Sequence, residues 1–192
     1  MIYVIVGPSH AGKTSFTMNS FMQGDEVTYS KDIVGVTKCG DNYLIGNYLV
    51  EKRAKGSDTV ARQEVKFIAD QVIKLASEGK TVVLEGDKIC SHPLLDRLID
   101  ENLPVKLYYI RCSIETSKKR NVAWNSTVND GVLKRVATKA KNIYLDYYKQ
   151  FDGEILDTDT IEDVHSISVE KNKGDFKHGY YTNDGLFEVR KD

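Results

Sequence analysis

The first residues that could do chemistry lie in a loop close to the start of the chain. The segment Gly7-Pro8-Ser9-His10-Ala11-Gly12-Lys13-Thr14 fits the pattern G-x-x-x-x-G-K-[ST] at every fixed position. Its two glycines let the backbone curl so that several N–H groups converge on phosphate oxygens. Lys13 can reach the β- and γ-phosphates of a nucleoside triphosphate, and the Thr14 hydroxyl can be a ligand of Mg²⁺. The pattern therefore predicts a site for ATP and Mg²⁺, with the nucleotide bound by Gly7, Ser9, His10, Ala11, Gly12, Lys13, Thr14 and Ser15.

The elements on either side of this loop suit phosphate binding. The apolar run Ile2–Val6 is typical of a buried strand, and residues 14–22 predict a helix that ends near Gly24. A helix that begins near Gly12 directs the positive end of its dipole at the bound phosphates. A glycine-rich turn that binds nothing is the alternative, and the strand–loop–helix context argues against it.

Acidic residues in two later segments could complete a phosphotransfer site, which needs a metal and a group that orients or deprotonates the acceptor. Glu85 ends a second apolar run, 81–84, and resembles the acid of a Walker B segment. It could hold the metal or act as a base, and Asp87 is a second option. Asp58, in the turn 56–59, either caps the following helix or holds an acceptor hydroxyl, and the sequence leaves both interpretations open.

Basic residues concentrate on two predicted helices that flank the polar segment 124–131. Such a run is usually a solvated helix face, but here it could also form a lid that closes over the triphosphate. Arg120 and Arg135 are the preferred catalytic pair, because a guanidinium group binds phosphate oxygens in a bidentate manner. The members of the run are Lys118, Lys119, Arg120, Lys134, Arg135, Lys139 and Lys141.

Aromatic side chains offer stacking surfaces for a nucleobase. The candidates are Tyr43, Tyr48, Trp124, Tyr180 and Tyr181. Aromatic residues in strands are more often core or cross-strand partners, so the sequence assigns none of them a role.

The order of predicted elements indicates an α/β domain built on a parallel sheet. Residues 27–50 contain strand formers around the turn Gly40-Asp41-Asn42, which predicts a strand or hairpin inserted after the first helix. Further strands are expected at 81–87, 105–110 and 155–157, helices at 60–77, 94–99, 113–123, 132–151 and 161–167, and a β-hairpin at 179–189. Because ligands bind at the carboxyl ends of parallel strands, Gly7, Glu85, Arg111 and Asp157 should lie at the same edge of the sheet.

Composition limits the class of protein. The 192 residues carry a formal net charge of −1, which does not indicate a uniformly basic nucleic-acid-binding surface. Cys39, Cys90 and Cys112 are unpaired in number and widely spaced, so no disulfide framework or zinc site is predicted. The chain opens on a predicted strand and no apolar run approaches 18 residues, so we expect no signal peptide, no membrane span and a cytoplasmic protein.

With the loop, the acid-ended strand and the basic segment together, the chain resembles the small P-loop kinases of nucleosides and nucleotides over roughly residues 1–160. The resemblance implies a P-loop kinase fold, with a parallel sheet flanked by helices, in a single domain. It also implies that residues 27–58 are an acceptor-binding insertion and that 118–141 form the lid, while 170–192 remain as a C-terminal hairpin tail.

A narrower resemblance is to phage kinases that phosphorylate the hydroxymethyl group of 5-hydroxymethyluracil in DNA. It rests on the segments Leu44-Ile45-Gly46-Asn47-Tyr48, Gly56-Ser57-Asp58-Thr59 and Leu84-Glu85-Gly86. One departure is Trp124, which stands where an Arg-x-x-x-Arg lid pattern beginning at Arg120 would have its second arginine.

This resemblance implies an ATP- and Mg²⁺-dependent phosphotransferase that acts on a nucleotide-like acceptor, with modified thymine in DNA as the specific case and the host cytoplasm as the location. Lys13, Asp58, Glu85, Arg120 and Arg135 would be its catalytic residues, and Thr14 and Glu85 would hold the metal. A kinase of free nucleoside monophosphates is the nearest alternative. A nucleotide-dependent ATPase switch or a nucleotide-binding protein, without any acceptor, is the alternative from another class.

Overall fold

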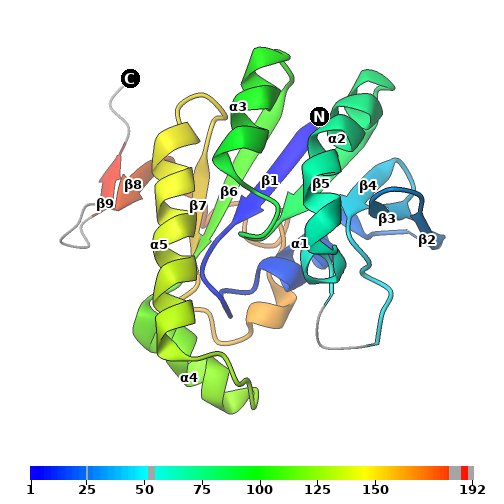
Figure 1. The fold of residues 1–192 in the computed structure, drawn as a ribbon. Coiled ribbons are helices and arrows are strands. Elements are labelled where there is room, and N and C mark those ends of the chain that lie inside the picture. The colour runs from blue at the N-terminus through cyan, green and yellow to red at the C-terminus, as the bar shows by residue number, and fades with distance from the viewer. Residues whose placement is uncertain (25, 52–54, 182–186, 190–192) are drawn as a thin grey trace.

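A computed structural model describes residues 1–24, 26–51, 55–181 and 187–189 of the chain. Within these residues a seven-stranded sheet of order β2-β3-β4-β5-β1-β6-β7 lies between helices (Figure 1). Its strands are β1 (Ile2–Val6), β2 (Val27–Lys31), β3 (Gly35–Cys39), β4 (Asn42–Ile45), β5 (Thr81–Glu85), β6 (Val105–Arg111) and β7 (Glu154–Asp157). The α-helices are α1 (Lys13–Phe21), α2 (Ile68–Ser77), α3 (His92–Asp100), α4 (Ile114–Ala123) and α5 (Asp130–Tyr147), and the 3₁₀ helices are η1 (Ser57–Thr59), η2 (Arg62–Phe67) and η3 (Val164–Ser166).

The predicted parallel sheet is correct for the five consecutive strands from β4 to the edge strand β7, in the order β4, β5, β1, β6 and β7. The segment 27–50 contributes β2, β3 and β4, which pair antiparallel with one another, so the sheet as a whole is mixed. The predicted insertion is thus an extension of the main sheet, because β4 pairs directly with β5.

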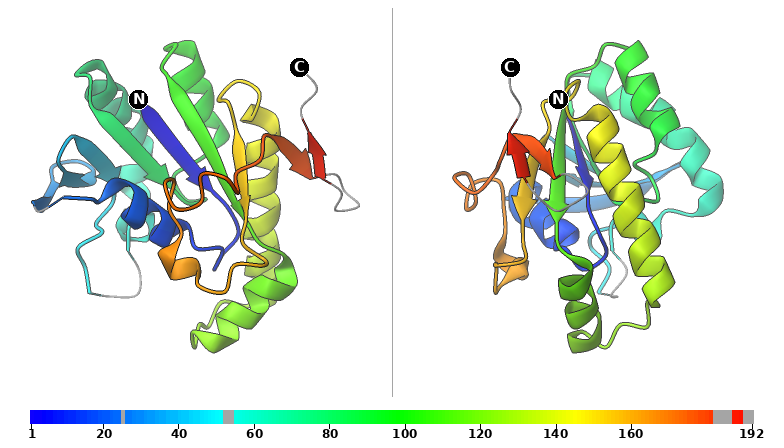
Figure 2. Two further views of the ribbon diagram at one scale, coloured as in Figure 1. Left: turned by 180° about the vertical axis from the view of Figure 1, so that it is seen from behind. Right: turned by 90° about the vertical axis from the view of Figure 1, so that its left-hand side faces the viewer.

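The central strands are buried on both faces, as their nearly continuous apolar sequences require. In β1, Ile2, Val4 and Val6 contribute to the core cluster that includes residues of α2, α3 and α5. Tyr3 and Ile5 point the other way and pack in the cluster that includes Phe16 and Phe21 of α1. This alternation produces three layers, with α2, α3 and α5 on one face of the sheet and α1 with η3 on the other (Figure 2).

Three predicted helices differ from the structure by more than two residues at one end, and one of them, expected over 132–151, is α5, which ends at Tyr147. The helix expected over residues 60–77 starts as the 3₁₀ helix η2 and becomes an α-helix only at Ile68, and the helix expected over 161–167 is reduced to η3. The predicted cap of α4 is confirmed, because the Ser113 hydroxyl accepts a hydrogen bond from the Thr116 N–H at 3.1 Å. The Asn129 side chain caps α5 in the same way.

The C-terminal segment forms the predicted hairpin, in which β8 (Gly179–Tyr181) pairs antiparallel with β9 (Phe187–Val189). The turn predicted at 183–185 lies outside the described residues. A bridge between Lys177 and Ile155 joins this segment to β7. Across the described part of the chain, no helix is both long enough and apolar enough to cross a membrane.

Candidate functional site

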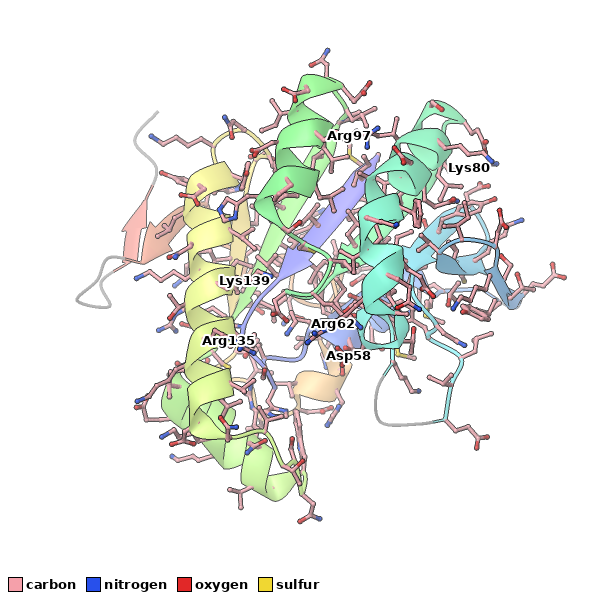
Figure 3. The ribbon with its side chains drawn as sticks, viewed as in Figure 1. Asp58, Arg62, Lys80, Arg97, Arg135 and Lys139 are labelled. Atoms are coloured by element: carbon pink, nitrogen blue, oxygen red, sulfur yellow. The ribbon has the colours of Figure 1, made fainter. Side chains whose placement is uncertain are left out.

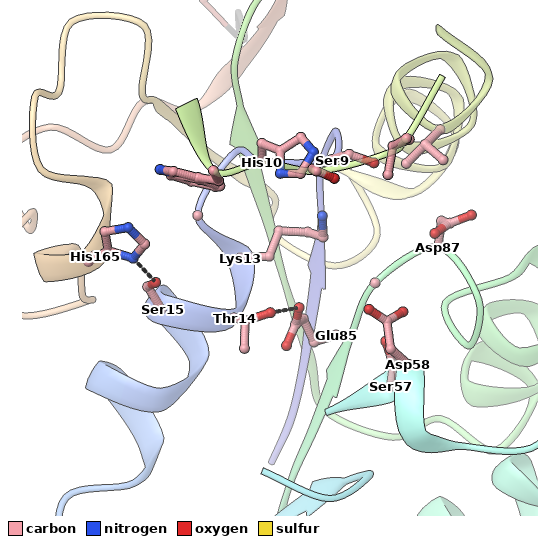
Figure 4. A pocket seen from close by; sticks show the side chains of 16 residues that line it. Ser9, His10, Lys13, Thr14, Ser15, Ser57, Asp58, Glu85, Asp87 and His165 are labelled. Carbon is pink, nitrogen blue, oxygen red and sulfur yellow. Dashed lines mark hydrogen bonds between the residues drawn. The ribbon is translucent and has the colours of Figure 1, made fainter. Parts of the chain in front are cut away.

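A cavity of about 630 Å³ opens at the carboxyl edge of the sheet (Figure 4). Five segments line it: the loop after β1 with the start of α1, the end of β5, the 3₁₀ helix η1, the connection from α4 to α5 with the first half of α5, and the 3₁₀ helix η3. From the first two segments come Ser9, His10, Gly12, Lys13, Thr14, Ser15, Glu85, Gly86 and Asp87, and from the others Ser57, Asp58, Trp124, Ser126, Val128 and Val136, with His165 from η3. A cavity of this volume falls in the range of about 300–1,000 Å³ that is typical of small-molecule sites.

The loop between β1 and α1 has a backbone suited to anions. His10 (φ 63°) and Gly12 (φ 98°) both adopt the left-handed conformation, and such alternation turns successive N–H groups towards one concave side. A β-carbon at Gly12 would lie 2.9 Å from the Ile167 side chain, and one at Gly7 would lie 2.1 Å from the Ile110 carbonyl oxygen. Both positions therefore require glycine, and the loop is held tightly between β6 and η3.

Lys13 is the first residue of α1. The first turn of this helix, whose N–H groups have no partner within the helix, lines the cavity together with the Lys13 side chain. The Lys13 Nζ donates a hydrogen bond to the Pro8 carbonyl at 2.8 Å. No acidic side chain occupies the first turn of α1. The positive end of this helix is thus available to an anionic ligand.

Glu85 lies at the floor of the cavity and is 4% exposed. Its Oε1 accepts a hydrogen bond from the Thr14 hydroxyl at 2.7 Å, and its Oε2 accepts one from the Tyr48 hydroxyl at 2.9 Å. Burial raises the pKa of the Glu85 carboxyl above its ordinary value, while the ammonium group of Lys13 and these two hydrogen bonds act in the opposite direction. Burial, together with the Glu85 charge, also raises the pKa of Tyr48 well above its usual value, which keeps the phenol a donor.

Thr14 and Glu85 fit a magnesium site that the protein only partly supplies. Within the described residues no group of three or more His, Cys, Asp or Glu side chains is arranged to hold a metal ion. The hydroxyl and carboxylate oxygens, 2.7 Å apart, are nevertheless the donor types that Mg²⁺ prefers. Mg²⁺ commonly completes its six ligands with substrate phosphates and water, so this pair would hold the ion only when a phosphate is bound.

Asp58 lines the cavity opposite the loop, and the first of its two predicted roles, a helix cap, is wrong. Its side chain caps none of the described helices, since η2 begins after Ala61 and the Glu64 carboxylate accepts the Ala61 N–H at 3.2 Å. Two lysines donate hydrogen bonds to backbone carbonyl groups of the segments that carry Asp58 and Asp87, and so hold these segments in place. Lys88 donates to the carbonyl oxygens of Val60 and Asp58, and Lys139 donates to that of Asp87.

Arg120 lies beneath the loop. Its guanidinium donates hydrogen bonds to the carbonyl oxygens of His10 (3.2 Å), Thr158 (2.6 Å) and Ile161 (3.3 Å), and to the Thr158 hydroxyl (3.1 Å). Arg120 is not one of the described residues that line the cavity. In this structure the side chain therefore links the loop to the segment after β7.

Arg135 is exposed on α5, beside Val136 of the cavity wall. In Figure 3 it is drawn on the side of α5 that faces η1 and η2, near Lys139. No ion pair or hydrogen bond with another described residue involves its guanidinium. The predicted catalytic pair is thus split, with Arg120 packed in the protein and Arg135 at the surface.

We expect Arg120→Ala to lower the free energy of unfolding by about 2 kcal/mol, because it leaves several carbonyl groups without a charged donor. Arg135→Ala is the matched control and should change it by less than about 0.5 kcal/mol, as for an ordinary surface position. Denaturant unfolding of the two variants beside the parent protein measures both values. Equal stability of the two variants would contradict the structural role of Arg120.

The comparisons with known proteins add no relative. No protein-family model matches the chain, and no curated protein sequence matches it. The chemistry of the cavity therefore carries the functional argument.

Three residues of the site have contacts that the sequence did not predict. Tyr48 binds a carboxylate 37 positions away, and His165 approaches Ser15, with 3.3 Å between the His165 Nδ1 and the Ser15 Oγ. The Trp124 ring lies 5.1 Å from the ring of His165 and 5.4 Å from that of His10, measured between centroids. Sequence reasoning singled out Tyr48 and Trp124 only as possible stacking surfaces, and it had no signal for His165.

Proposed function

We propose that this protein is an ATP- and Mg²⁺-dependent phosphotransferase that moves the γ-phosphate of ATP to a hydroxyl group of a nucleotide-like acceptor. One observation carries the proposal: the anion-binding loop and three carboxylates line the same cavity. The carboxylates belong to Asp58, Glu85 and Asp87. Phosphoryl transfer depends on charge stabilisation beside a group that orients or deprotonates the acceptor, and this cavity supplies both.

On the donor side, the N–H groups between Gly7 and Ser15 and the positive end of α1 bind the phosphates. The Lys13 ammonium balances charge that develops on the oxygens of the transferred group. Thr14 and Glu85 would hold Mg²⁺, which supplies further positive charge to the phosphates when it is bound.

On the acceptor side, Asp58 takes the hydroxyl proton, and its position in the lining of the cavity supports this role. As the acceptor oxygen bonds to the γ-phosphorus, the bond from that phosphorus to the β–γ bridging oxygen breaks, ADP leaves, and the proton passes to the Asp58 carboxylate. Asp87 lies on the same side of the cavity and provides a second carboxylate. The hydroxymethyl group of 5-hydroxymethyluracil in DNA is the specific acceptor that we propose. Such a base must leave its stack to enter the cavity.

Incubation with γ-labelled ATP and Mg²⁺ tests the proposal. We expect label to appear in single-stranded DNA that contains 5-hydroxymethyluracil and not in the same sequence with thymine. Transfer of label only to free nucleoside monophosphates would show that the acceptor is a free nucleotide and not DNA. Release of labelled phosphate without any labelled acceptor would favour an ATPase switch, and the absence of both products would overturn the proposal.

We expect Tyr48→Phe to shift the acidic limb of the activity–pH profile to higher pH. The Tyr48 hydrogen bond favours the ionised Glu85, so its loss raises the pKa of Glu85 further. The metal requires the ionised carboxylate, and activity therefore rises only above that pKa. A decrease of about 10-fold or more at the lower pH values, recovered as pH increases, is expected for the loss of such a supporting contact. An unchanged profile would contradict the role of the hydrogen bond. Tyr43→Phe, at a half-buried tyrosine of β4 outside the cavity lining, is the control.

A further inference from the structure

The cavity has two chemically different ends, separated by the phosphate-binding side chains. In Figure 4, Lys13 and Thr14 lie in the middle, His165 and Ser15 lie on one side, and Asp58 and Asp87 lie on the other. The Asp58 end is therefore acidic, while the His165 end is aromatic.

The aromatic end consists of Trp124 and His165, and the ring of His10, which also lines the cavity, packs against Trp124. The planes of Trp124 and His165 are inclined by 41° with centroids 5.1 Å apart, and both residues line the cavity. His10 meets Trp124 edge-on, with an interplanar angle of 77°. Flat side chains of this kind present faces on which any nucleobase can stack.

The backbone around His165 is fixed to the phosphate-binding helix. The Asn19 side chain, one turn after Ser15 in α1, donates hydrogen bonds to the carbonyl oxygens of His165 (2.7 Å) and Ile167 (3.0 Å). The N–H of Trp124 continues α4 by bonding to the Arg120 carbonyl oxygen at 2.9 Å, and the Arg120 guanidinium is bonded to the loop. Both rings are consequently anchored to the elements that hold the phosphates.

Charge determines which substrate belongs at which end. The carboxylates of Asp58 and Asp87 repel the α- and β-phosphates of a donor and are suited to an acceptor hydroxyl. With the γ-phosphate directed towards the acidic end, the rest of the nucleotide extends towards Ser15 and the rings.

We infer that Trp124 and His165 form the base site of the donor nucleotide, which is held by stacking at the end of the cavity opposite the acceptor. The inference rests on the proposed function in taking a nucleoside triphosphate as the ligand. It adds which side chains recognise the base and the direction in which the donor lies.

Trp124 is the only tryptophan of the chain, so its fluorescence reports on this end of the cavity alone. We expect ATP with Mg²⁺ to quench the emission, and inorganic tripolyphosphate with Mg²⁺ to bind, as measured by calorimetry, with little quenching. Trp124→Ala and His165→Ala should each weaken ATP binding by about 10-fold, as for loss of one stacking face, and leave tripolyphosphate affinity unchanged. Trp124→Phe keeps an aromatic ring and should restore most of the affinity.

Two results would overturn the base site while leaving the proposed function standing. One is ATP affinity that is unchanged in both alanine variants. The other is quenching by 5-hydroxymethyluridine alone and not by ATP, which would place the acceptor at the rings. If neither ATP nor tripolyphosphate binds the parent protein, the proposed function fails at its phosphate site, and the base site fails with it.

Discussion

Lys13→Ala is expected to reduce phosphoryl transfer by about 10³-fold, the order found when a single group that stabilises transition-state charge is removed. The side chain contributes one positive charge at the centre of the cavity and, among the described residues, one hydrogen bond, to the Pro8 carbonyl oxygen. Lys13 is not one of the buried core residues of the described chain. The variant should therefore fold normally and show its defect in the rate of transfer.

The Lys13 charge also acts on the neighbouring carboxylate. It lowers the pKa of Glu85, so the alanine variant should show an acidic limb of its activity–pH profile displaced to higher pH. Single-turnover transfer measured across a pH series separates this displacement from the loss of rate at its plateau. Lys74→Ala, on the exposed side of α2, is the control for removal of a lysine. Full activity of Lys13→Ala at every pH would contradict the mechanism.

Glu85→Gln should lower activity by about 10²-fold while the protein keeps or gains stability. The amide retains the shape of the side chain but removes the negative charge that would hold Mg²⁺, so the Mg²⁺ concentration required for half-maximal rate should rise. The effect on stability has the opposite sign because the carboxylate is buried. Its pKa is raised on folding, so the folded state loses stability as pH rises from the ordinary glutamate range through this raised pKa. The amide does not titrate and avoids that loss.

Denaturant unfolding at neutral pH and a Mg²⁺ titration of activity together test the Glu85 prediction. Glu78→Gln, at the exposed end of α2, controls for the loss of one negative charge. A Glu85→Gln protein that is strongly destabilised at neutral pH would show that Glu85 serves the fold. Unchanged Mg²⁺ dependence with normal stability would remove Glu85 from the metal site.

Local patterns in the sequence were sufficient to predict the strand and the helix on either side of the loop 7–14. The run before Gly7 and the helix after Gly12 are specified by neighbouring residues, as is the turn at Gly40 between β3 and β4. The start of the next helix was predicted wrongly. Val65 has helical spacing to Ile68 and Ala69, but the observed hydrogen-bonded turns of residues 62–67 are 3₁₀, and regular α-helix begins at Ile68.

The candidate site was predictable only where a local pattern in the sequence marks its residues. Lys13 and Thr14 follow from the loop pattern, and Glu85 follows from its place at a strand end. Composition alone cannot distinguish Arg120, bound to carbonyl oxygens, from the other cations of its segment, because that distinction depends on the path of the chain after β7. For the same reason no sequence signal places Tyr48 against Glu85 or His165 against Ser15.

The antiparallel strands at the edge of the sheet cannot be treated as an exchangeable module. The Thr37 hydroxyl of β3 donates to the Gly46 carbonyl oxygen at 2.8 Å and accepts the Tyr48 N–H at 3.0 Å, which fixes the residue that holds Glu85. A graft of β2 and β3 from another protein, made to change the choice of acceptor, would therefore alter the carboxylate across the sheet as well. Changes of acceptor should instead be sought at exposed positions of η2 such as Arg62, because in η1 the Thr59 hydroxyl accepts the Asn47 N–H at 2.8 Å and so supports the residue next to Tyr48.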